Sequence, residues 1–159
     1  MNTIDVLIYE SGDGGELSIM NDDLVFSELI YNQTYLALFG GNIAENTKRD
    51  YLFTEQRFDY WGNTLFHSET PTEQFNSNTE RTIRNIALTS SGRAELIRAV
   101  EADLAYLNDV LTFSVDVVFF DKNKIKIMIK FESKTNQESQ ALQLIYDNAK
   151  NELIIDKII

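Results

Sequence analysis

The chain begins with a pattern of alternating apolar and polar residues. Ile4, Val6 and Ile8 stand at every second position, and Leu17 and Ile19 repeat this spacing after the sequence SGDGG. A period of two is typical of a β-strand that buries one face. The glycines and the aspartate of SGDGG supply the positive-φ residues that a tight reversal needs, so this region is predicted to form a β-hairpin.

The last third of the chain shows the same alternation in longer runs, which predict antiparallel strands. Apolar residues occupy every second position from Phe113 to Phe119 and from Ile125 to Phe131. If both sets face one core, Phe119 lies opposite Ile125. That register leaves a three-residue loop in which Asn123 takes the left-handed conformation. A further strand is predicted in ALQLIYD, followed by a turn at DNAKN and an apolar ending, ELIIDKII.

The outward positions of these strands are not uniformly polar. They include four large apolar residues, Val118, Phe120, Met128 and Ile145. Either helices cover this face of the sheet, or a partner does. The register also places Asp116 diagonally opposite two lysines, Lys126 and Lys130, as a weak cross-strand charge pairing.

Between the two β regions, apolar residues recur at steps of three and four, the period of an amphipathic helix. A first helix is predicted to begin at Leu24 and to continue through Ala37. Asp22 or Asp23 would be its N-cap, because a carboxylate accepts hydrogen bonds from the free N–H groups of a first turn. Gly40-Gly41 would end the helix.

Two more helices are predicted before the closing strands. The second covers about residues 79–88. The sequence TSSG then caps the third helix. Its apolar face carries Ile97, Val100, Leu104 and Leu107, opposite Arg93, Glu101 and Asp103.

These elements predict an α+β fold: an N-terminal β-hairpin, about three helices, and C-terminal antiparallel strands that form a sheet covered by helices. The length of 159 residues suits one domain, residues 1–159. Residues 42–78 hold no period for long, so a long irregular loop is expected there. No basic and apolar leader is present, and no apolar run approaches roughly 20 residues, so a soluble chain without an export signal is expected.

Charge is distributed unevenly along the chain. The sequence has 14 Lys and Arg against 25 Asp and Glu, a net charge of −11. Such a surface repels phosphate backbones and anionic lipid headgroups, so neither nucleic acid nor a membrane is an expected partner. Residues 1–47 contain eight acidic residues and no Lys or Arg. This acidic end is either a solvated face or an oriented contact with a basic neighbour.

The residue types that catalysis and metal binding most often use are scarce. Cysteine is absent and His67 is the only histidine, which excludes thiolate chemistry and a closed zinc site. There is no GxSxG motif, and GDGG lacks the lysine of a phosphate-binding loop. We therefore expect no enzyme activity, no catalytic or metal-binding residues, no cofactor and no small-molecule substrate.

The stretch RFDYWGNTLF, residues 57–66, contains four aromatic residues in ten. Tyr60 and Trp61 beside Arg57 have the composition of a protein-interface hot spot. The same rings would equally well point inward and fasten a long loop to the helices, and Gly62 fits a turn in either interpretation. The candidate protein-interface residues are Arg57, Tyr60, Trp61, Gly62, Asp22 and Asp23.

Taken in order, several of these segments resemble those of one known family. They are IDVLIYESGDGGELSIMNDDL, VFSELIYNQTYLALFGG, RFDYWGNTL and RTIRNIALTSSGRAELIRAVEADLAYL. The chain is similar to the tail baseplate protein family of Mu-like contractile phages, which is related to the small baseplate wedge subunits of contractile tails. The resemblance covers nearly the whole chain. The sequence departs from the family pattern in a middle loop poorer in proline and charge, and in Tyr60 where a second tryptophan is usual.

The resemblance implies a non-enzymatic structural subunit of a contractile-tail baseplate wedge in a bacteriophage or prophage. Its expected partners are other wedge, sheath or tube proteins. Its expected location is the virion tail baseplate, after synthesis in the cytoplasm of the bacterial host. The alternative is a non-catalytic module that binds a small molecule or a peptide through Trp61 and Tyr60.

Overall fold

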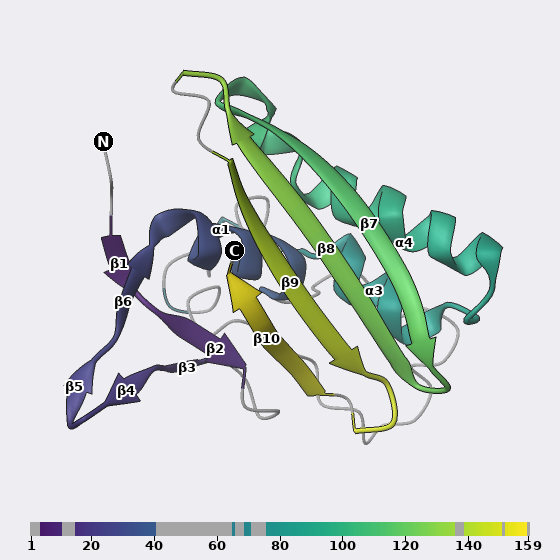
Figure 1. Cartoon of the computed structure of the whole chain (residues 1–159), viewed down its shortest axis with the longest axis horizontal. Helices are drawn as coiled ribbons and strands as arrows, with labels where there is room; N and C mark the ends of the chain where they lie inside the picture. The colour runs from purple at the N-terminus through teal and green to yellow at the C-terminus, as the bar shows by residue number, and fades with distance from the viewer. Residues whose placement is uncertain are drawn as a thin grey trace.

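The computed structural model of the chain has an α+β fold, as the sequence predicts (Figure 1). A four-stranded antiparallel sheet packs against a layer of helices, and short two-stranded ladders precede them at the N-terminus. In the part of the chain that the structure describes, no helix is long and apolar enough to cross a bilayer. The described residues are 4–10, 15–40, 65, 69–70, 76–135, 139–150 and 152–158.

The main sheet has the strand order β10-β9-β8-β7. Its strands are β7 (Leu111–Asp121), β8 (Lys124–Ser133), β9 (Ser139–Asp147) and β10 (Glu152–Ile158). β7 and β8 pair in the predicted register, with Phe119 opposite Ile125. Because side chains alternate between the faces of a strand, Ile125, Ile127 and Ile129 all point to the helical side. Their side chains are fully buried there.

The turn between β7 and β8 differs from the prediction. The register shifts between Phe119 and Asp121, so that Asp121 pairs with Lys124 and a two-residue turn remains. Asn123 lies in that turn without a positive φ, so the predicted left-handed conformation is wrong. The irregularity at Phe120 absorbs the extra residue that the longer predicted loop would have held.

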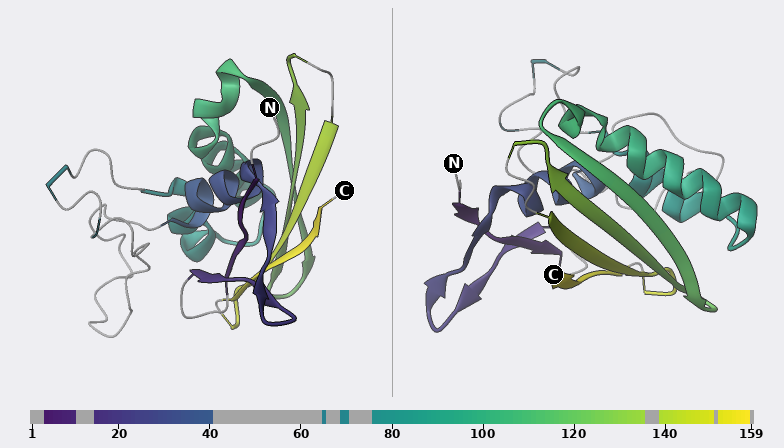
Figure 2. Two further views of the ribbon diagram at one scale, coloured as in Figure 1. Left: turned by 90° about the vertical axis from the view of Figure 1, so that its left-hand side faces the viewer. Right: turned by 45° about the horizontal axis from the view of Figure 1, so that its top comes forward.

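The described helices lie on one face of the main sheet (Figure 2). They are α1 (Leu29–Phe39), α3 (Asn78–Asn85), α4 (Ser90–Asp103) and the 3-10 helix η2 (Ala105–Asp109). α4 contacts β7 and contributes the fully buried Leu96 and Val100 to the core. Leu38 of α1 and Ile83 of α3 complete this core between helices and sheet. Burying each such side chain contributes roughly 1.5–3 kcal/mol.

The start of α4 confirms the cap predicted from TSSG. The Thr89 hydroxyl oxygen accepts a hydrogen bond from the Gly92 backbone N–H at 3.3 Å. A Cβ at position 92 would overlap the Ala87 carbonyl oxygen, so glycine lets this turn pack closely on the preceding segment. α3 ends at Asn85, three residues before the predicted end, because Ile86 already has an extended backbone.

The N-terminal arm, described residues 4–10 and 15–28, departs most from the prediction. The antiparallel pairing of residues 8–10 with 15–17 is confirmed, and the predicted turn at 11–14 lies outside the described residues. The first helix begins at Leu29 rather than Leu24. Residues 19–28 form strands instead, and the last of these returns to pair with the first strand of the chain. The strands are β1 (Ile4–Val6), β2 (Ile8–Glu10), β3 (Gly15–Leu17), β4 (Ile19–Met20), β5 (Asp23–Leu24) and β6 (Phe26–Glu28).

Asp22 and Asp23 therefore do not cap a helix. Asn21 and Asp22 have φ values of 53° and 63°, as the two central residues of a two-residue hairpin turn require. Asp23 belongs to β5 and pairs with Met20. Asparagine and aspartate adopt positive φ more readily than other non-glycine residues. The turn chemistry of this local sequence thus outweighs the helical spacing of the apolar residues.

The three ladders of the arm meet at one point. The Leu7 N–H donates to the Val25 carbonyl at 2.7 Å, the Val25 N–H to the Ser18 carbonyl at 2.9 Å, and the Ser18 N–H to the Leu7 carbonyl at 2.9 Å. This cycle of hydrogen bonds closes a three-way junction of the β1-β6, β2-β3 and β4-β5 ladders. It satisfies backbone groups between strands that are too short to be stable alone.

The buried side chain of Asn32 fixes the arm to α1. Its Nδ2 donates to the Val6 carbonyl at 2.6 Å and to the Asp5 carboxylate at 3.2 Å. Its Oδ1 accepts from the Ile8 N–H at 3.2 Å. β2 also contacts β10 of the main sheet. The inner end of the arm is thus held by the rest of the chain, whereas the β4-β5 hairpin extends away from it (Figures 1 and 2).

Candidate functional site

Of the candidate interface residues, the structure describes Asp22 and Asp23. Both are exposed at the tip of the β4-β5 hairpin. The candidates Arg57, Tyr60, Trp61 and Gly62 lie outside the described residues. Trp61 therefore keeps both of its interpretations, as an interface residue or as a side chain that points inward against the helices.

The residues on either side of the RFDYWGNTLF segment meet at one point of the helical layer. Leu38 stands in the last turn of α1, before that segment, and Ser77 is the N-cap of α3, after it. The buried Ser77 hydroxyl donates a hydrogen bond to the Leu38 carbonyl. This hydrogen bond therefore joins two residues that are 39 positions apart in the sequence.

Asp103, at the end of α4, completes this contact, and we call Leu38, Ser77 and Asp103 the clamp. Its carboxylate accepts hydrogen bonds from the Asn78 N–H at 3.0 Å and the Thr79 N–H at 2.7 Å, and lies 3.2 Å from the Ser77 hydroxyl oxygen. The first N–H groups of a helix have no partner within it, and a carboxylate is favoured at that end of the helix dipole. Asp103 thus acts as a second cap of α3.

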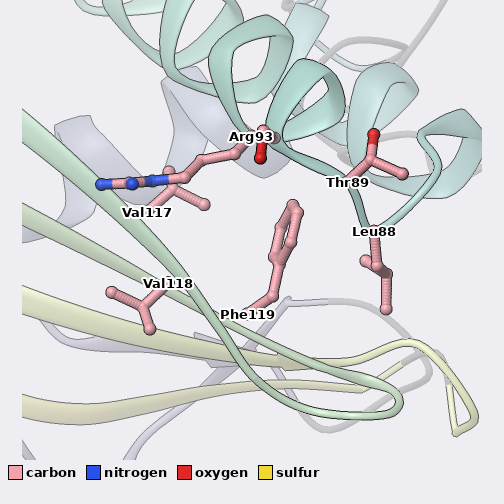
Figure 3. Close-up of a pocket in the computed structure, with 7 residues that line it drawn as sticks. Leu88, Thr89, Arg93, Val117, Val118 and Phe119 are labelled. Atoms are coloured by element: carbon pink, nitrogen blue, oxygen red, sulfur yellow. The ribbon is translucent and has the colours of Figure 1, made fainter.

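A pocket opens between the start of α4 and β7 (Figure 3). Its volume is about 430 Å³, within the range of small-molecule sites. In Figure 3 the Phe119 ring points toward the first turn of α4, and the Arg93 side chain runs away from the ring past Val117. The lining residues are Leu88, Thr89, Ser90, Arg93, Val117, Val118 and Phe119.

Two polar side chains of this pocket already have partners. The Thr89 hydroxyl caps α4. Arg93 Nη2 lies 2.6 Å from Asp116 Oδ1, across the edge strand β7. Asp116 is diagonal to Lys126 and Lys130 as predicted, but its partner is this arginine. Both side chains of the pair are about half exposed, so it contributes less than about 1 kcal/mol. The pocket provides no evident nucleophile and base within reach of each other.

The outer surface of the N-terminal arm is apolar to an unusual degree. Six described residues of this short segment are large, apolar and at least 40% exposed: Ile4, Leu17, Ile19, Met20, Leu24 and Phe26. Single exposed apolar side chains are ordinary, whereas several in one short segment are typical of a binding region. The alternation of Ile4, Leu17 and Ile19 was evident in the sequence, whereas Leu24 and Phe26 were predicted to lie on a helix. The exposure of these side chains was not evident.

The charge of the arm has one sign. Asp22 and Asp23 at its tip, and Asp5 at its base, are exposed, and residues 1–47 contain no Lys or Arg. An apolar surface with only carboxylates around it attracts a partner that carries Lys or Arg and repels one that carries acids.

The outer face of the main sheet is the second exposed surface. The described helices lie on the opposite face, and Val118 and Phe120 are 40% and 47% exposed. Met128 and Ile145 are partly exposed on the same face. Lys126 Nζ lies 5.4 Å from the centre of the Phe120 ring, which allows a weak cation-π attraction. Among the described residues, no helix covers this face of the sheet.

Other titratable groups do not assemble into a further site in the described residues. There, no group of three or more His, Asp or Glu side chains is placed to hold a metal ion. Partial burial raises the pKa of Tyr106 to about 12. The Tyr106 hydroxyl donates to the Gln33 carbonyl at 3.2 Å, which links η2 to α1 and gives the residue a structural explanation.

Comparison of the chain with models of known protein families, with curated proteins and with solved structures found no match. A proposal about function therefore rests on two kinds of observation. The first is the resemblance of the segments in the sequence. The second is the pair of exposed surfaces on the arm and on the sheet.

Proposed function

We propose that the chain is a structural subunit of a contractile-tail baseplate wedge, from a bacteriophage or a prophage, that holds neighbouring tail proteins in register. The observation that carries the proposal is the N-terminal arm, with its six exposed large apolar side chains. A surface of that kind on a segment without Lys or Arg is suited to a protein partner rather than to solvent alone.

The resemblance to the Mu-like baseplate family supplies the kind of partner. The α+β fold and the order of its elements are consistent with that resemblance, although many unrelated proteins share such a fold. A wedge subunit has to contact more than one neighbour. The chain has one exposed apolar surface on the arm and another on the outer face of the sheet, which suits that role.

We also assign the RFDYWGNTL segment to contacts with tail partners. Its candidate interface residues remain Arg57, Tyr60, Trp61 and Gly62, which lie outside the described residues.

The test is assembly of tails in the organism that encodes the chain. The gene is deleted and replaced by a copy with a C-terminal tag, which leaves the arm free. We expect the tagged chain in purified tail particles and no complete baseplates in the deletion strain. Normal contractile tails without the chain would overturn the proposal.

Matched variants separate a surface role from a folding role. Phe26→Ser removes an apolar side chain of the arm that is 58% exposed, and Val110→Thr removes one that is 59% exposed outside it. We expect Phe26→Ser to lower the amount of chain in the particles and Val110→Thr to leave it unchanged. Equal incorporation of both variants would show that the arm is not the docking surface.

A further inference from the structure

The outer face of the main sheet carries positive charge at its centre. Lys126 is flanked in the ladder by Val118 and Ile145, and Lys130 by Ser114 and Ala141. Neither lysine therefore has a carboxylate directly opposite it. The acids of this face include Asp116, which pairs with Arg93, and Asp121, Glu132, Asp147 and, opposite Asp147, Glu152 toward the strand ends.

This face matches the N-terminal arm in two respects. Exposed apolar side chains lie on both, with Val118 and Phe120 on the sheet and Ile19 and Met20 near the tip of the arm. The charges are opposite. Asp22 and Asp23 form the acidic tip of the arm, while the centre of the sheet face carries Lys126 and Lys130. Opposite charges around apolar side chains favour one docking orientation and suppress others.

From this complementarity we propose that the arm of one copy of the chain binds the outer sheet face of a second copy. Contact between two arms would bring together two surfaces that carry acids and no Lys or Arg, which opposes association. Contact between two sheet faces would leave both acidic tips without a basic partner. The arm-to-sheet contact places the acidic tip of one copy beside the lysines of the other.

Such a contact joins two different surfaces, so a pair of copies keeps one arm and one sheet face free. The assembly is a ring if the rotation closes and an open chain if it does not. The carboxylates at the tip of the arm are exposed, so the interaction is sensitive to salt. The inference does not depend on the tail assignment, because it concerns the purified chain alone.

The test is the molar mass of the purified full chain, measured by sedimentation equilibrium in low-salt buffer up to about 1 mM protein. The expected mass rises above that of the monomer with concentration and falls again in about 1 M salt, where charge interactions are screened within about 3 Å. A chain that stays monomeric at every concentration overturns the proposal.

A charge exchange identifies the surfaces. Asp23→Lys on the arm and Lys126→Glu on the sheet should each weaken self-association at least about tenfold, because like charges then face each other. The double variant Asp23→Lys/Lys126→Glu should restore association to within about threefold of the original chain. Glu95→Lys, an exposed position on α4 with the same charge change as Asp23→Lys, is the control and should have little effect.

Two further results complete the test. Met20→Ser should weaken association while Val110→Ser, which replaces a similarly exposed apolar side chain outside the arm with the same residue, should not. Circular dichroism and urea unfolding of each variant confirm that it is folded. Association that persists unchanged in both single charge variants, or that the double variant fails to restore, overturns the arm-to-sheet contact.

Discussion

The main sheet and the N-terminal arm are both built from alternating apolar residues, yet they bury them to opposite extents. Ile125 and Ile127 of the sheet are completely buried, whereas Ile4 and Ile19 of the arm are 70% and 68% exposed. Alternation assigns side chains to the two faces of a strand. Burial requires in addition a second layer to cover one face. The helices provide that layer for the sheet, whereas in the arm Ile8 packs against the same core.

The comparison shows that the two regions are held by different forces. Apolar burial between helices and strands holds the sheet. The shape of the arm depends on backbone hydrogen bonds at the junction of Leu7, Ser18 and Val25, and on the side chain of Asn32. The exposed apolar side chains of the arm are thus not required for its shape and are available to a second surface.

The largest effect is expected from truncation within the sheet core. Ile127→Ala removes a fully buried side chain and should lower the free energy of unfolding by about 2–5 kcal/mol, the range for such cavities. Urea unfolding followed by circular dichroism measures it. Val118→Ala on the outer face of the same sheet is the control and should lower it by much less. Similar losses in the two variants would contradict the assignment of the inner face as the core.

The clamp should give the next largest effect. Asp103→Ala leaves the Asn78 and Thr79 N–H groups without their carboxylate, at a cost of about 1–3 kcal/mol. Glu101→Ala, at an exposed position of the same helix, should change stability by less than about 0.5 kcal/mol. Both are measured by urea unfolding. If the two variants are equally stable, Asp103 does not cap α3.

The connection between arm and helix gives a smaller, local effect. Asn32→Ala removes the hydrogen bonds to Val6 and Ile8, so the arm should open more often than the rest of the fold. Amide hydrogen exchange should accelerate at Ile8 while Ile127 exchanges at nearly its original rate. Asn108→Ala, at an exposed position, is the control. Equal acceleration in the arm and the sheet would show that the arm is part of the core unit.

The smallest effect is expected at the edge of the sheet. Arg93→Ala removes an ion pair whose side chains are 49% and 50% exposed, so the loss of stability should be under about 1 kcal/mol. That loss should disappear in about 1 M salt, which screens exposed charges. Urea unfolding of the original chain and of the Arg93→Ala variant, at low and at high salt, measures this loss of stability. A loss that persists in high salt would indicate that the arginine contributes by packing instead.

Local sequence signals predicted the elements whose contacts are close in the chain. The pairing of Phe119 with Ile125 follows from alternation alone, and the Thr89 cap follows from TSSG. The prediction failed at Leu24, where apolar spacing indicated a helix but the turn at Asn21 and Asp22 redirects the chain into a strand. Two local rules conflicted there, and hydrogen bonds to distant strands decided between them.

The contacts that define the clamp were beyond sequence reasoning. Asp103 and Asn78 are 25 positions apart, and only the packing of α3 against α4 brings them together. The sequence placed Asp103 merely on a polar helix face. It did identify Asp22 and Asp23 as candidate interface residues, and both are exposed on the arm. It did not predict that the apolar residues beside them would be uncovered, because periodicity carries no information about the layer above.

The most direct test of the contrast between sheet and arm is urea unfolding of one variant of the arm, Ile19→Ser/Met20→Ser/Phe26→Ser. The three side chains are between 58% and 68% exposed. The account predicts a free energy of unfolding within about 1 kcal/mol of that of the original chain, because the substitutions remove surface and not core. A loss of several kcal/mol, comparable to that of Ile127→Ala, would contradict it.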